Sequence, residues 1–523
     1  MAASTRMRGR ITVHGRGFGF LNPLTPSADA VAAFITPPDL NRFLADDVVE
    51  ADVTTAADGR RSAANLALVQ RGRAQVTGSV VMRGGKSFLH PEADVANTDL
   101  PLDTAGTAVR PSDVVVADVL PTGLRLARVL PADADVPLER VIVRHGIRSR
   151  FPDSAQRETD TLLRAGHELR ARRDLRAVPT VTVDAPTTRD IDDAVSVLPA
   201  DPTGGLRLLV SIADASEWVR EGTALDEEAR ARATSVYLAG RVLPMLPPAL
   251  SEDHASLHPG MDRLALTAEL RVDPDGNVTS VDVFESLIRS HARLNYEEVA
   301  AFLDHGEVSE AMAPIRDHLR WFRAADARLG VARGRRGGAV FARDEARLSV
   351  NPQTQEVVIL GDDRAHSAHG MIERFMVAAN EAVGRWLNDR GVPAPWRVHD
   401  PPESDAVVDL EAFMDHFGFG AGLGGRLTPG ALAGIYAQVH GAPCEPAVRS
   451  VMLRTLGPAR YDARPVGHFG LAAPLYLHFT SPLRRYADLV VHRTVKAYLR
   501  GQRDFSPLAQ QLPALTEHIN ERA

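Results

Sequence analysis

The sequence has almost no cysteine and no long apolar run. The single cysteine among 523 residues, Cys444, cannot form an intrachain disulfide or supply the several thiolates of a zinc or iron–sulfur site. No stretch approaches the ~20 apolar residues that cross a bilayer, and no apolar segment follows the basic N-terminal residues. We therefore expect a cytoplasmic chain with no disulfide partner and no membrane association.

Acidic residues are missing from two N-terminal stretches. The chain as a whole has 60 Lys and Arg against 67 Asp and Glu, a formal net charge of −7, which argues against a protein coated in positive charge. No Asp or Glu precedes Asp29, however, and none occurs from Gly59 to Pro91, although both stretches contain several arginines. This segregation predicts that a polyanion binds near the N-terminus and that metal binding or catalysis lies elsewhere.

Length and patterning predict several folded domains of α+β type. The 44% of hydrophobic and 24% of charged residues are typical of folded soluble proteins. Residues 1–150 alternate short β-rich runs with Gly, Pro and Asp turns in two similar cycles, which predicts two small barrels. The later chain mixes strands with longer helices, the clearest over residues 367–389. The expected parts are barrels at 1–70 and 71–150, a basic helical connector at 151–176, a catalytic domain at 177–501 and a C-terminal helix at 502–523.

Four aspartates follow an expected strand at residues 178–183. Asp184, Asp190, Asp192 and Asp193 lie in and after a proline-containing turn, so their carboxylates converge. Oxygen-only ligands suit Mg²⁺ or Mn²⁺, and in phosphodiester hydrolysis two such ions ~4 Å apart can activate the attacking water and stabilise the leaving oxygen. The alternative is that these aspartates form turns and helix caps. A calcium loop is excluded, because Val195 stands where that loop needs a bidentate glutamate.

A second cluster of polar residues spans residues 468–493. Ser481 and Pro482 predict the start of a helix, and Arg484 and Arg485 would lie in its first turn. The amides, the dipole and the two guanidinium groups would then favour a phosphate. The alternative is a solvated basic helix end that pairs with Asp488 and nearby acids.

These two segments together resemble the catalytic domain of the ribonuclease II / ribonuclease R (RNB) family of 3′→5′ exoribonucleases. The resemblance covers most of residues 180–500 and includes several further stretches in order, among them Val210-Ser-Ile-Ala-Asp214, Thr234-Ser-Val-Tyr237, Ile288-Arg-Ser-His-Ala-Arg-Leu294 and Phe375-Met-Val-Ala-Ala-Asn380. A series of motifs in order is far more specific than any one of them.

The resemblance implies a role for each matching residue of the acidic and basic segments. Asp184, Asp190, Asp192 and Asp193 match the family's magnesium-binding and catalytic aspartates. Among them, Asp192 matches the position whose loss abolishes cleavage while RNA binding persists. Arg484 matches the family's catalytic arginine, with Arg485 beside it as an RNA contact.

The resemblance also implies RNA contacts for several aromatic residues. Tyr237 and Phe341 match residues that stack on the ends of a column of bases, and Tyr296 and Glu373 match positions linked to ribose recognition. For the aromatic residues among these, the alternative is core packing. In the N-terminal part, Arg16-Gly-Phe18-Gly-Phe20-Leu resembles the RNA-binding strand of cold-shock OB barrels, although Phe18 or Phe20 could simply fill a barrel.

The implied function is a magnesium-dependent 3′→5′ exoribonuclease. We expect a monomer that degrades single-stranded RNA processively or nearly so to nucleoside 5′-monophosphates, in RNA turnover, with one or two Mg²⁺ ions and Mn²⁺ as a possible substitute. Family members usually continue into a C-terminal RNA-binding barrel, whereas this sequence stops at Ala523, so it is either naturally short or a fragment. Two alternatives stay open: a catalytically silent RNA-binding protein, and a metal-dependent phosphoesterase acting on DNA or small nucleotides.

Overall fold

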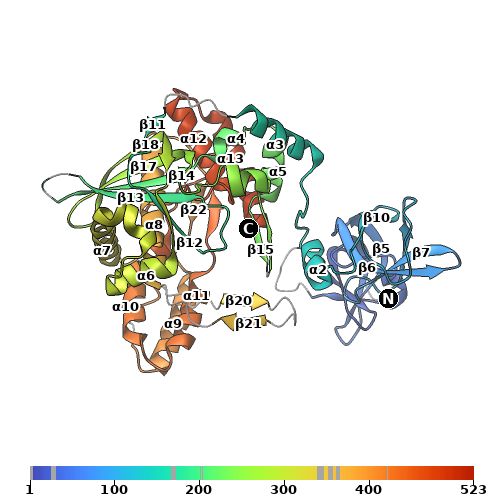
Figure 1. Cartoon of the computed structure of the whole chain (residues 1–523). Coiled ribbons are helices and arrows are strands. Elements are labelled where there is room, and N and C mark those ends of the chain that lie inside the picture. The colour runs from blue at the N-terminus through green and yellow to red at the C-terminus, as the bar shows by residue number, and fades with distance from the viewer. Residues whose placement is uncertain are drawn as a thin grey trace. The chain divides into compact units, whose positions relative to one another are not determined.

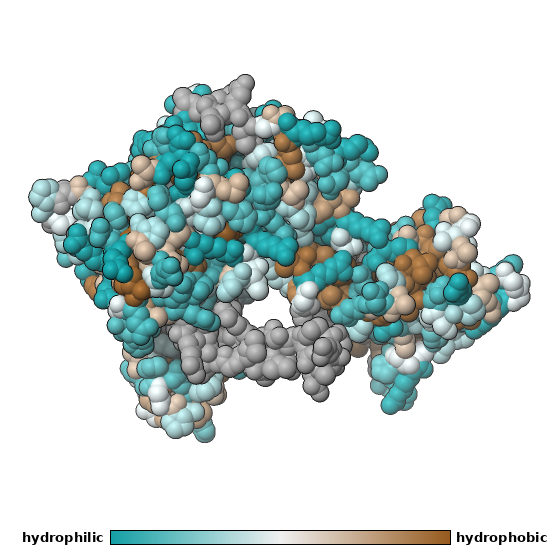
Figure 2. All heavy atoms as spheres, in the orientation of Figure 1, coloured by the Kyte–Doolittle hydropathy of each residue, from teal (hydrophilic) through white to brown (hydrophobic). Residues whose placement is uncertain are grey.

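A computed structural model describes residues 4–24, 31–166, 172–200, 202, 204–238, 240–338, 347–350, 357–360, 366–420 and 422–523, with backbone alone at 347–350, 357–360 and 366. The chain divides into two units, Met1–Arg150 (unit 1) and Phe151–Ala523 (unit 2) (Figure 1). Among the described residues no helix is long and apolar enough to cross a membrane. Hydrophilic residues cover most of the face of unit 2 seen in Figure 2.

Unit 1 contains two closed five-stranded barrels with the same topology. The first has the order β1-β2-β3-β5-β4 and the second β10-β8-β7-β6-β9, so each strand of one has a counterpart in the other. In each barrel one pair is parallel, β3 with β5 and β8 with β10, as in the five-stranded Greek-key OB fold. The strands are β1 Ser4–Val13, β2 Gly19–Pro23, β3 Ala33–Ile35, β4 Val48–Thr55, β5 Arg61–Gln70, β6 Gln75–Arg83, β7 Lys86–Pro91, β8 Leu100–Asp103, β9 Val114–Leu120 and β10 Gly123–Val129.

Alternation along the strands fills each barrel. In β4, Val49, Ala51 and Val53 are buried in the first barrel's core, whereas the intervening Glu50 and Asp52 face outward. Two helices accompany the barrels, α1 Pro37–Leu40 and α2 Val136–Arg144. The expected repeat of two barrels is therefore confirmed, and the OB class with it.

Unit 2 is built on a seven-stranded mixed sheet. Its order is β11-β18-β17-β14-β13-β12-β19, and β17 and β18 form a long antiparallel hairpin. The alternating residues of β14 are buried on opposite faces: Leu208 and Val210 belong to one core, whereas Leu209 and Ala213 belong to another. The strands are β11 Arg173–Asp174, β12 Val181–Asp184, β13 Asp193–Pro199, β14 Leu206–Ala213, β17 Asp262–Val272, β18 Val278–Arg289 and β19 Ala292–Asn295.

Helices cover both faces of this sheet. In Figure 1, α7 and α8 lie below β13, β14 and β17, and α4, α12 and α13 lie above them. One core includes α6 Tyr296–His305, η2 Glu310–His318, α7 Leu319–Arg335 and α8 His366–Asn388. The other includes α3 Asp153–Ala165, α4 Ala215–Trp218, α5 Ala224–Arg232, η1 Ala249–His254, α12 Tyr486–Leu499 and α13 Ser506–Arg522.

The remaining elements of unit 2 form small additions. α9 Ser404–His416, α10 Pro429–Val439 and α11 Glu445–Leu456 share a core of their own. Three two-stranded sheets pair β15 Val236–Leu238 with β16 Arg241–Leu243, β20 Arg347–Val350 with β21 Val357–Leu360, and β22 Trp396–Val398 with β23 Arg460–Asp462; η3 spans Phe469–Leu471. Cys444 is a free cysteine.

Two helix predictions need correction. The helical connector expected at 151–176 is a shorter helix, Asp153–Ala165, which stops at Gly166, whose φ of 67° is favourable for glycine. Its Leu162 and Leu163 pack on the core of unit 2, so this helix belongs to that unit. The helix expected from Ser481 begins five residues later, at Tyr486, because residues 482–484 form a turn.

Candidate active site

The four aspartates lie around the loop that joins β12 to β13. Asp184 ends β12 and Asp193 begins β13, while Asp190 and Asp192 flank Ile191, which is fully buried. Because Ile191 anchors the loop in the core, its two neighbours are held in place. The loop is also held by Arg293, whose Nη2 donates to three carbonyl oxygens at residues 185, 186 and 188, the closest at 2.6 Å.

Asp192 is the most buried member of this group, with 3% of its surface exposed. Its Oδ1 accepts a hydrogen bond from the backbone N–H of Leu483 at 2.9 Å, and its Oδ2 accepts from Nε of Arg484 at 3.1 Å. Nη2 of Arg484 donates to Ser481 Oγ at 2.9 Å. The turn at 481–484 thus fixes a carboxylate and a guanidinium side by side, although they lie 292 residues apart in the sequence.

Burial and mutual repulsion raise the pKa of three of these carboxyl groups. Burial, opposed by Arg293 and reinforced by Asp192, raises the pKa of Asp184 to about 7. Burial raises the pKa of Asp192 to about 7 even though Arg484 and the Leu483 amide favour its charged form. Burial and Asp184 raise the pKa of Asp193 to about 7. The protein's own cations therefore do not balance this group of acids, and an added cation would.

The residues fit a divalent metal ion. Oδ2 of Asp184 is buried and has no hydrogen-bond partner in the part of the chain that the structure describes, and a buried carboxylate oxygen without a partner is costly. The ligands available are all carboxylate oxygens, which suits Mg²⁺ or Mn²⁺ better than a softer metal. Asp184, Asp190, Asp192 and Asp193 are the residues that the sequence predicts as its ligands.

A second group of carboxylates in unit 2 differs from the four aspartates because cations of the protein already bind it. Among the described residues, Asp214, Glu217 and Glu285 place carboxylate oxygens within 4.8 Å of one another. Three cations already bind this group: Arg172 contacts all three acids, Lys496 contacts the first two, and Arg500 contacts the last two. These six residues, the ion network, leave no uncompensated acid for a metal.

Tyr237 approaches the aspartates from the β15–β16 hairpin. Its hydroxyl donates to Asp190 Oδ2 at 3.1 Å, and 54% of the residue is exposed. The preceding segment is fastened to the arginine turn, since Ser235 N–H and Thr234 Oγ1 both donate to the carbonyl of Arg484, at 3.0 and 3.1 Å. The hairpin thereby presents an open aromatic ring beside the carboxylates, and core packing does not explain this residue.

The helix N-terminus expected to form a phosphate site at Ser481 is not present, since residues 482–484 form a turn and α12 begins at Tyr486. The amides that would serve it are used within the protein: Leu483 N–H binds Asp192, and Ser481 N–H binds Asp488 Oδ1 at 2.8 Å. Arg485 makes two hydrogen bonds to Asp488, at 2.9 and 2.7 Å, which engage two of its three guanidinium nitrogens. The pairing with Asp488 that the sequence left as an alternative is present, whereas Arg484 keeps 41% of its side chain exposed.

The other residues predicted to bind RNA are spread over unit 2. Tyr296, the first residue of α6, stacks on His369 with ring centroids 3.7 Å apart. Glu373 on α8 accepts from Nη1 of Arg333 at 2.8 Å, with 53% of its side chain exposed. Phe341 lies outside the described residues.

In the first barrel, Phe18 and Phe20 belong to an aromatic cluster outside the hydrophobic core. Phe34 lies 5.6 and 6.0 Å from them between centroids, and His14 stacks on Phe18 at 4.5 Å. None of these rings is among the residues that fill the barrel. The alternative that Phe18 or Phe20 fills the barrel is therefore wrong.

Sequence reasoning missed several partners of these residues. Phe34 could have been found from the alternation Ala33-Phe34-Ile35, whose middle residue faces outward. The other two could not have been found. Arg333 reaches Glu373 only because α7 packs against α8, and His369 meets Tyr296 only because α6 packs against α8.

Two known families match the chain. The RNB domain matches residues 172–501 and the Ribonuclease B OB domain matches residues 9–69. Ribonuclease R of Thermotoga maritima is 34% identical over 91% of this chain and 70% of that protein, and ribonuclease R of Escherichia coli is 32% identical over 94% of this chain and 62% of that protein.

Solved structures share the fold. RNase R of Mycoplasma genitalium, in complex with ribose-methylated single-stranded RNA, superposes with a TM-score of 0.81 at 22% identity and covers 99% of this chain and 84% of that chain. Yeast Ssd1, a pseudonuclease, superposes with a TM-score of 0.63 at 17% identity and covers 99% of this chain and 72% of that chain.

The matching domain models define the class of protein, an RNB-domain ribonuclease with an OB domain before the catalytic domain. The chain belongs to the ribonuclease II / ribonuclease R (RNB) family of 3′→5′ exoribonucleases. It is an exoribonuclease, a hydrolase of RNA phosphodiester bonds, and the nucleases of its family depend on a metal.

Proposed function

We propose that the chain degrades single-stranded RNA processively from its 3′ end to nucleoside 5′-monophosphates with Mg²⁺, as part of RNA turnover. The observation that carries this proposal is Asp192, which is held by Leu483 N–H and Arg484 among three further aspartates, while Asp184 Oδ2 has no partner within the described ranges. Asp184, Asp190, Asp192 and Asp193 would hold one or two Mg²⁺ ions, with Mn²⁺ as a substitute. The bound cation would supply Lewis acidity and charge neutralisation at the scissile phosphate.

The protein's own groups then bind and orient the substrate. Arg484 is held by Asp192 and Ser481 with part of its guanidinium exposed, so it can stabilise negative charge that develops on the phosphate. Tyr237 offers an exposed ring for the base next to that phosphate. Contacts to a ribose 2′-hydroxyl from Tyr296 and Glu373 would distinguish RNA from DNA.

We propose that the barrels bind the RNA before it is cleaved. Phe18 and Phe20, with Phe34 and His14, form an aromatic surface on which bases can stack without sequence preference. Phe341 would stack similarly inside the catalytic domain, and Arg485 would act on RNA mainly by holding the turn that carries Arg484. The domains proposed are 1–70, 71–150 and 177–501, with the helices of 151–176 and 502–523 packed on the core of the last, in a monomeric cytoplasmic protein.

A time course on 5′-labelled single-stranded RNA with Mg²⁺ tests the proposal. We expect fragments that shorten from the 3′ end, release of 5′-monophosphates detected by chromatography, and no reaction in EDTA or on the matched DNA. Processivity is measured by adding an excess of unlabelled RNA after the reaction has started. Labelled RNA that is already being degraded should continue to shorten. RNA that is bound but stays full length would instead indicate a silent RNA-binding protein, and equal cleavage of DNA would indicate a general phosphoesterase.

A further inference from the structure

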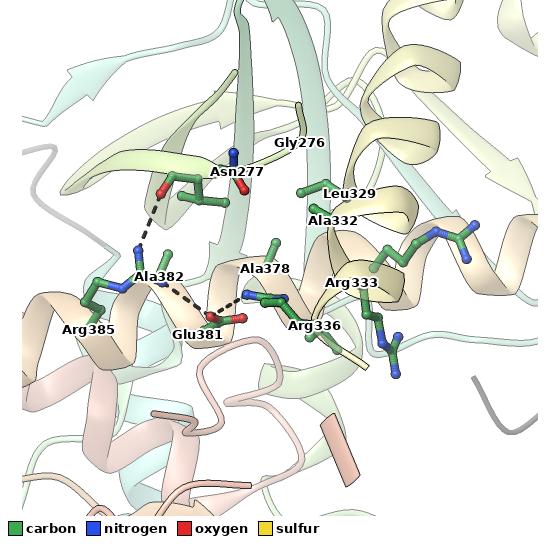
Figure 3. Close-up of a pocket in the computed structure, with 13 residues that line it drawn as sticks. Gly276, Asn277, Leu329, Ala332, Arg333, Arg336, Ala378, Glu381, Ala382 and Arg385 are labelled. Atoms are coloured by element: carbon green, nitrogen blue, oxygen red, sulfur yellow. Dashed lines mark hydrogen bonds and ion pairs between the residues drawn. The ribbon is translucent and has the colours of Figure 1, made fainter. Parts of the chain in front are cut away.

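A cleft lined by arginines lies in unit 2 outside the acidic site. It is enclosed by the C-terminal half of α7, the middle of α8 and the turn between β17 and β18, and its volume is about 230 Å³ (Figure 3). Its charged lining consists of four arginines and one acid: Arg333, Arg336, Arg374, Arg385 and Glu381.

The acids around the cleft do not balance its arginines. Figure 3 shows Arg336 and Arg385 reaching Glu381 from opposite sides, and both donate to the same oxygen, Oε1, at 2.8 and 3.3 Å. Arg374 pairs with Asp326 at 2.5 Å, so that cation is neutralised separately. Counting only the residues that the structure describes, one buried carboxylate thus serves two guanidinium groups, each with 43% of its side chain exposed, and one positive charge remains for an anion from solvent.

A buried donor in the lining supports this conclusion independently. Arg333 is 6% exposed; its Nη1 donates to Glu373, but its Nε is buried and has no hydrogen-bond partner among the described residues. A buried charged donor without an acceptor is costly, and a bound anion would supply one. Gly338 makes room for this side chain, since a Cβ at that position would lie 2.6 Å from Arg333 Cγ.

The partial negative charge at the C-terminus of α7 does not cancel the positive charge of these arginines. The carbonyl oxygens of its last turn are occupied by backbone amides: Arg336 N–H donates to the carbonyls of Ala332 and Arg333, and Gly337 N–H donates to that of Gly334. The partial charge of unsatisfied carbonyls at a helix C-terminus is therefore reduced here.

We propose that this cleft binds the phosphate group of a nucleoside 5′-monophosphate, the product of the reaction. Guanidinium groups match the geometry of a phosphate dianion, and the cleft is smaller than the ~300–1,000 Å³ typical of sites for larger ligands, so it suits one nucleotide rather than a polymer. Arg333 links the cleft to Glu373, the proposed ribose contact of the last nucleotide. The product is assigned on the basis of the proposed function, whereas the anion site itself is not.

Two substitutions with opposite expected effects test the site. In EDTA, at low salt and without RNA, calorimetric titration with adenosine 5′-monophosphate should show binding that Arg336→Gln weakens about tenfold, the usual effect of losing one charge-assisted hydrogen bond. Glu381→Gln removes the competing carboxylate and should tighten binding. General damage to the fold would weaken both. Arg320→Gln is the matched control, since that exposed arginine stacks on Trp321 on the same helix.

The titrant identifies the ligand. Inorganic phosphate should bind more weakly than the nucleotide, and adenosine should not bind. Equal affinity for phosphate and nucleotide would overturn the product assignment, and no change of affinity in either Arg336→Gln or Glu381→Gln would overturn the site. Because the titration involves no cleavage, its failure and the failure of the nuclease assay are distinguishable.

Discussion

Unit 2 contains two groups of carboxylates that differ in how their charge is balanced. In the ion network, Asp214, Glu217 and Glu285 meet Arg172, Lys496 and Arg500, and every acid has cationic partners. Around Asp192 the acids outnumber the cations that touch them.

The pKa values of the carboxyl groups differ in the same way. Lys496 and Arg172 outweigh burial and lower the pKa of Asp214 and of Glu217, whereas burial and repulsion raise the pKa of Asp184 and Asp192 to about 7. Proximity of carboxylate oxygens alone would select the ion network as the metal site. Charge balance instead favours the other group, which is the metal site that we propose.

The largest expected effect is on catalysis at the unbalanced site. Asp192→Asn removes one ligand charge and the partner of Arg484 without changing side-chain volume, so hydrolysis should fall roughly a thousandfold or more. RNA affinity, measured by fluorescence anisotropy, should stay within about twofold because the RNA-stacking surfaces are untouched. Asp282→Asn, at an exposed position on β18, is the control that should retain activity. Equal loss of binding and cleavage would mean that Asp192 mainly holds the fold.

The next effect is on stability at the balanced site. Lys496→Met leaves Asp214, which is buried, with one fewer cation, and breaking a buried pair in this way typically destabilises by about 3–5 kcal/mol. Asp184→Asn should be neutral or stabilising in EDTA, because it removes an uncompensated buried charge. Urea unfolding of both variants measures the contrast. A similar loss of unfolding free energy in both variants would contradict the difference in charge balance between the two groups.

Metal binding should stabilise the protein through one group only. Mg²⁺ at about a hundred times its Kd should stabilise the folded chain by about 2.7 kcal/mol, visible as a rise in Tm over the EDTA sample. We expect Asp184→Asn to lose most of this rise and Glu285→Gln to keep it. A rise abolished by Glu285→Gln instead would place the ion in the network.

A smaller effect is expected in the acid range. The pKa of Glu217 and Asp214 is lower in the folded state than in the unfolded chain, so their contribution to stability is present above the ordinary carboxyl pKa of ~4 and is lost as pH falls below it. Urea midpoints between pH 3 and 6 should therefore fall with acidification more steeply in the parent protein than in Asp214→Asn. If the urea midpoints of the two proteins fall in parallel with pH, the ion network does not determine the stability of the protein in acid.

Local patterns in the sequence predicted the elements that carry the site. Apolar spacing predicted α8 to within a residue at each end, and the strand expected at 178–183 overlaps β12. The cluster Asp184, Asp190, Asp192 and Asp193 could be found because its members are close in sequence and follow one strand.

Long-range contacts decided what local patterns could not. The serine–proline signal at Ser481 and Pro482 predicted a helix start, but the turn is held instead by bonds from Leu483 to Asp192 and from Ser481 to Asp488. The pairing of Arg333 with Glu373 joins two helices across 40 residues. No propensity or spacing rule contains such contacts, because they depend on how α7 and α8 pack.

The bond between Asp192 and Arg484 has a consequence for synthesis. A ribosome makes the aspartate loop 292 residues before the arginine, and Asp488, which fixes the arginine turn, follows later still. A nascent chain therefore has the carboxylates but lacks their guanidinium partner until translation has passed this turn. This site can therefore be completed only late in co-translational folding, after every strand of the seven-stranded sheet has been made.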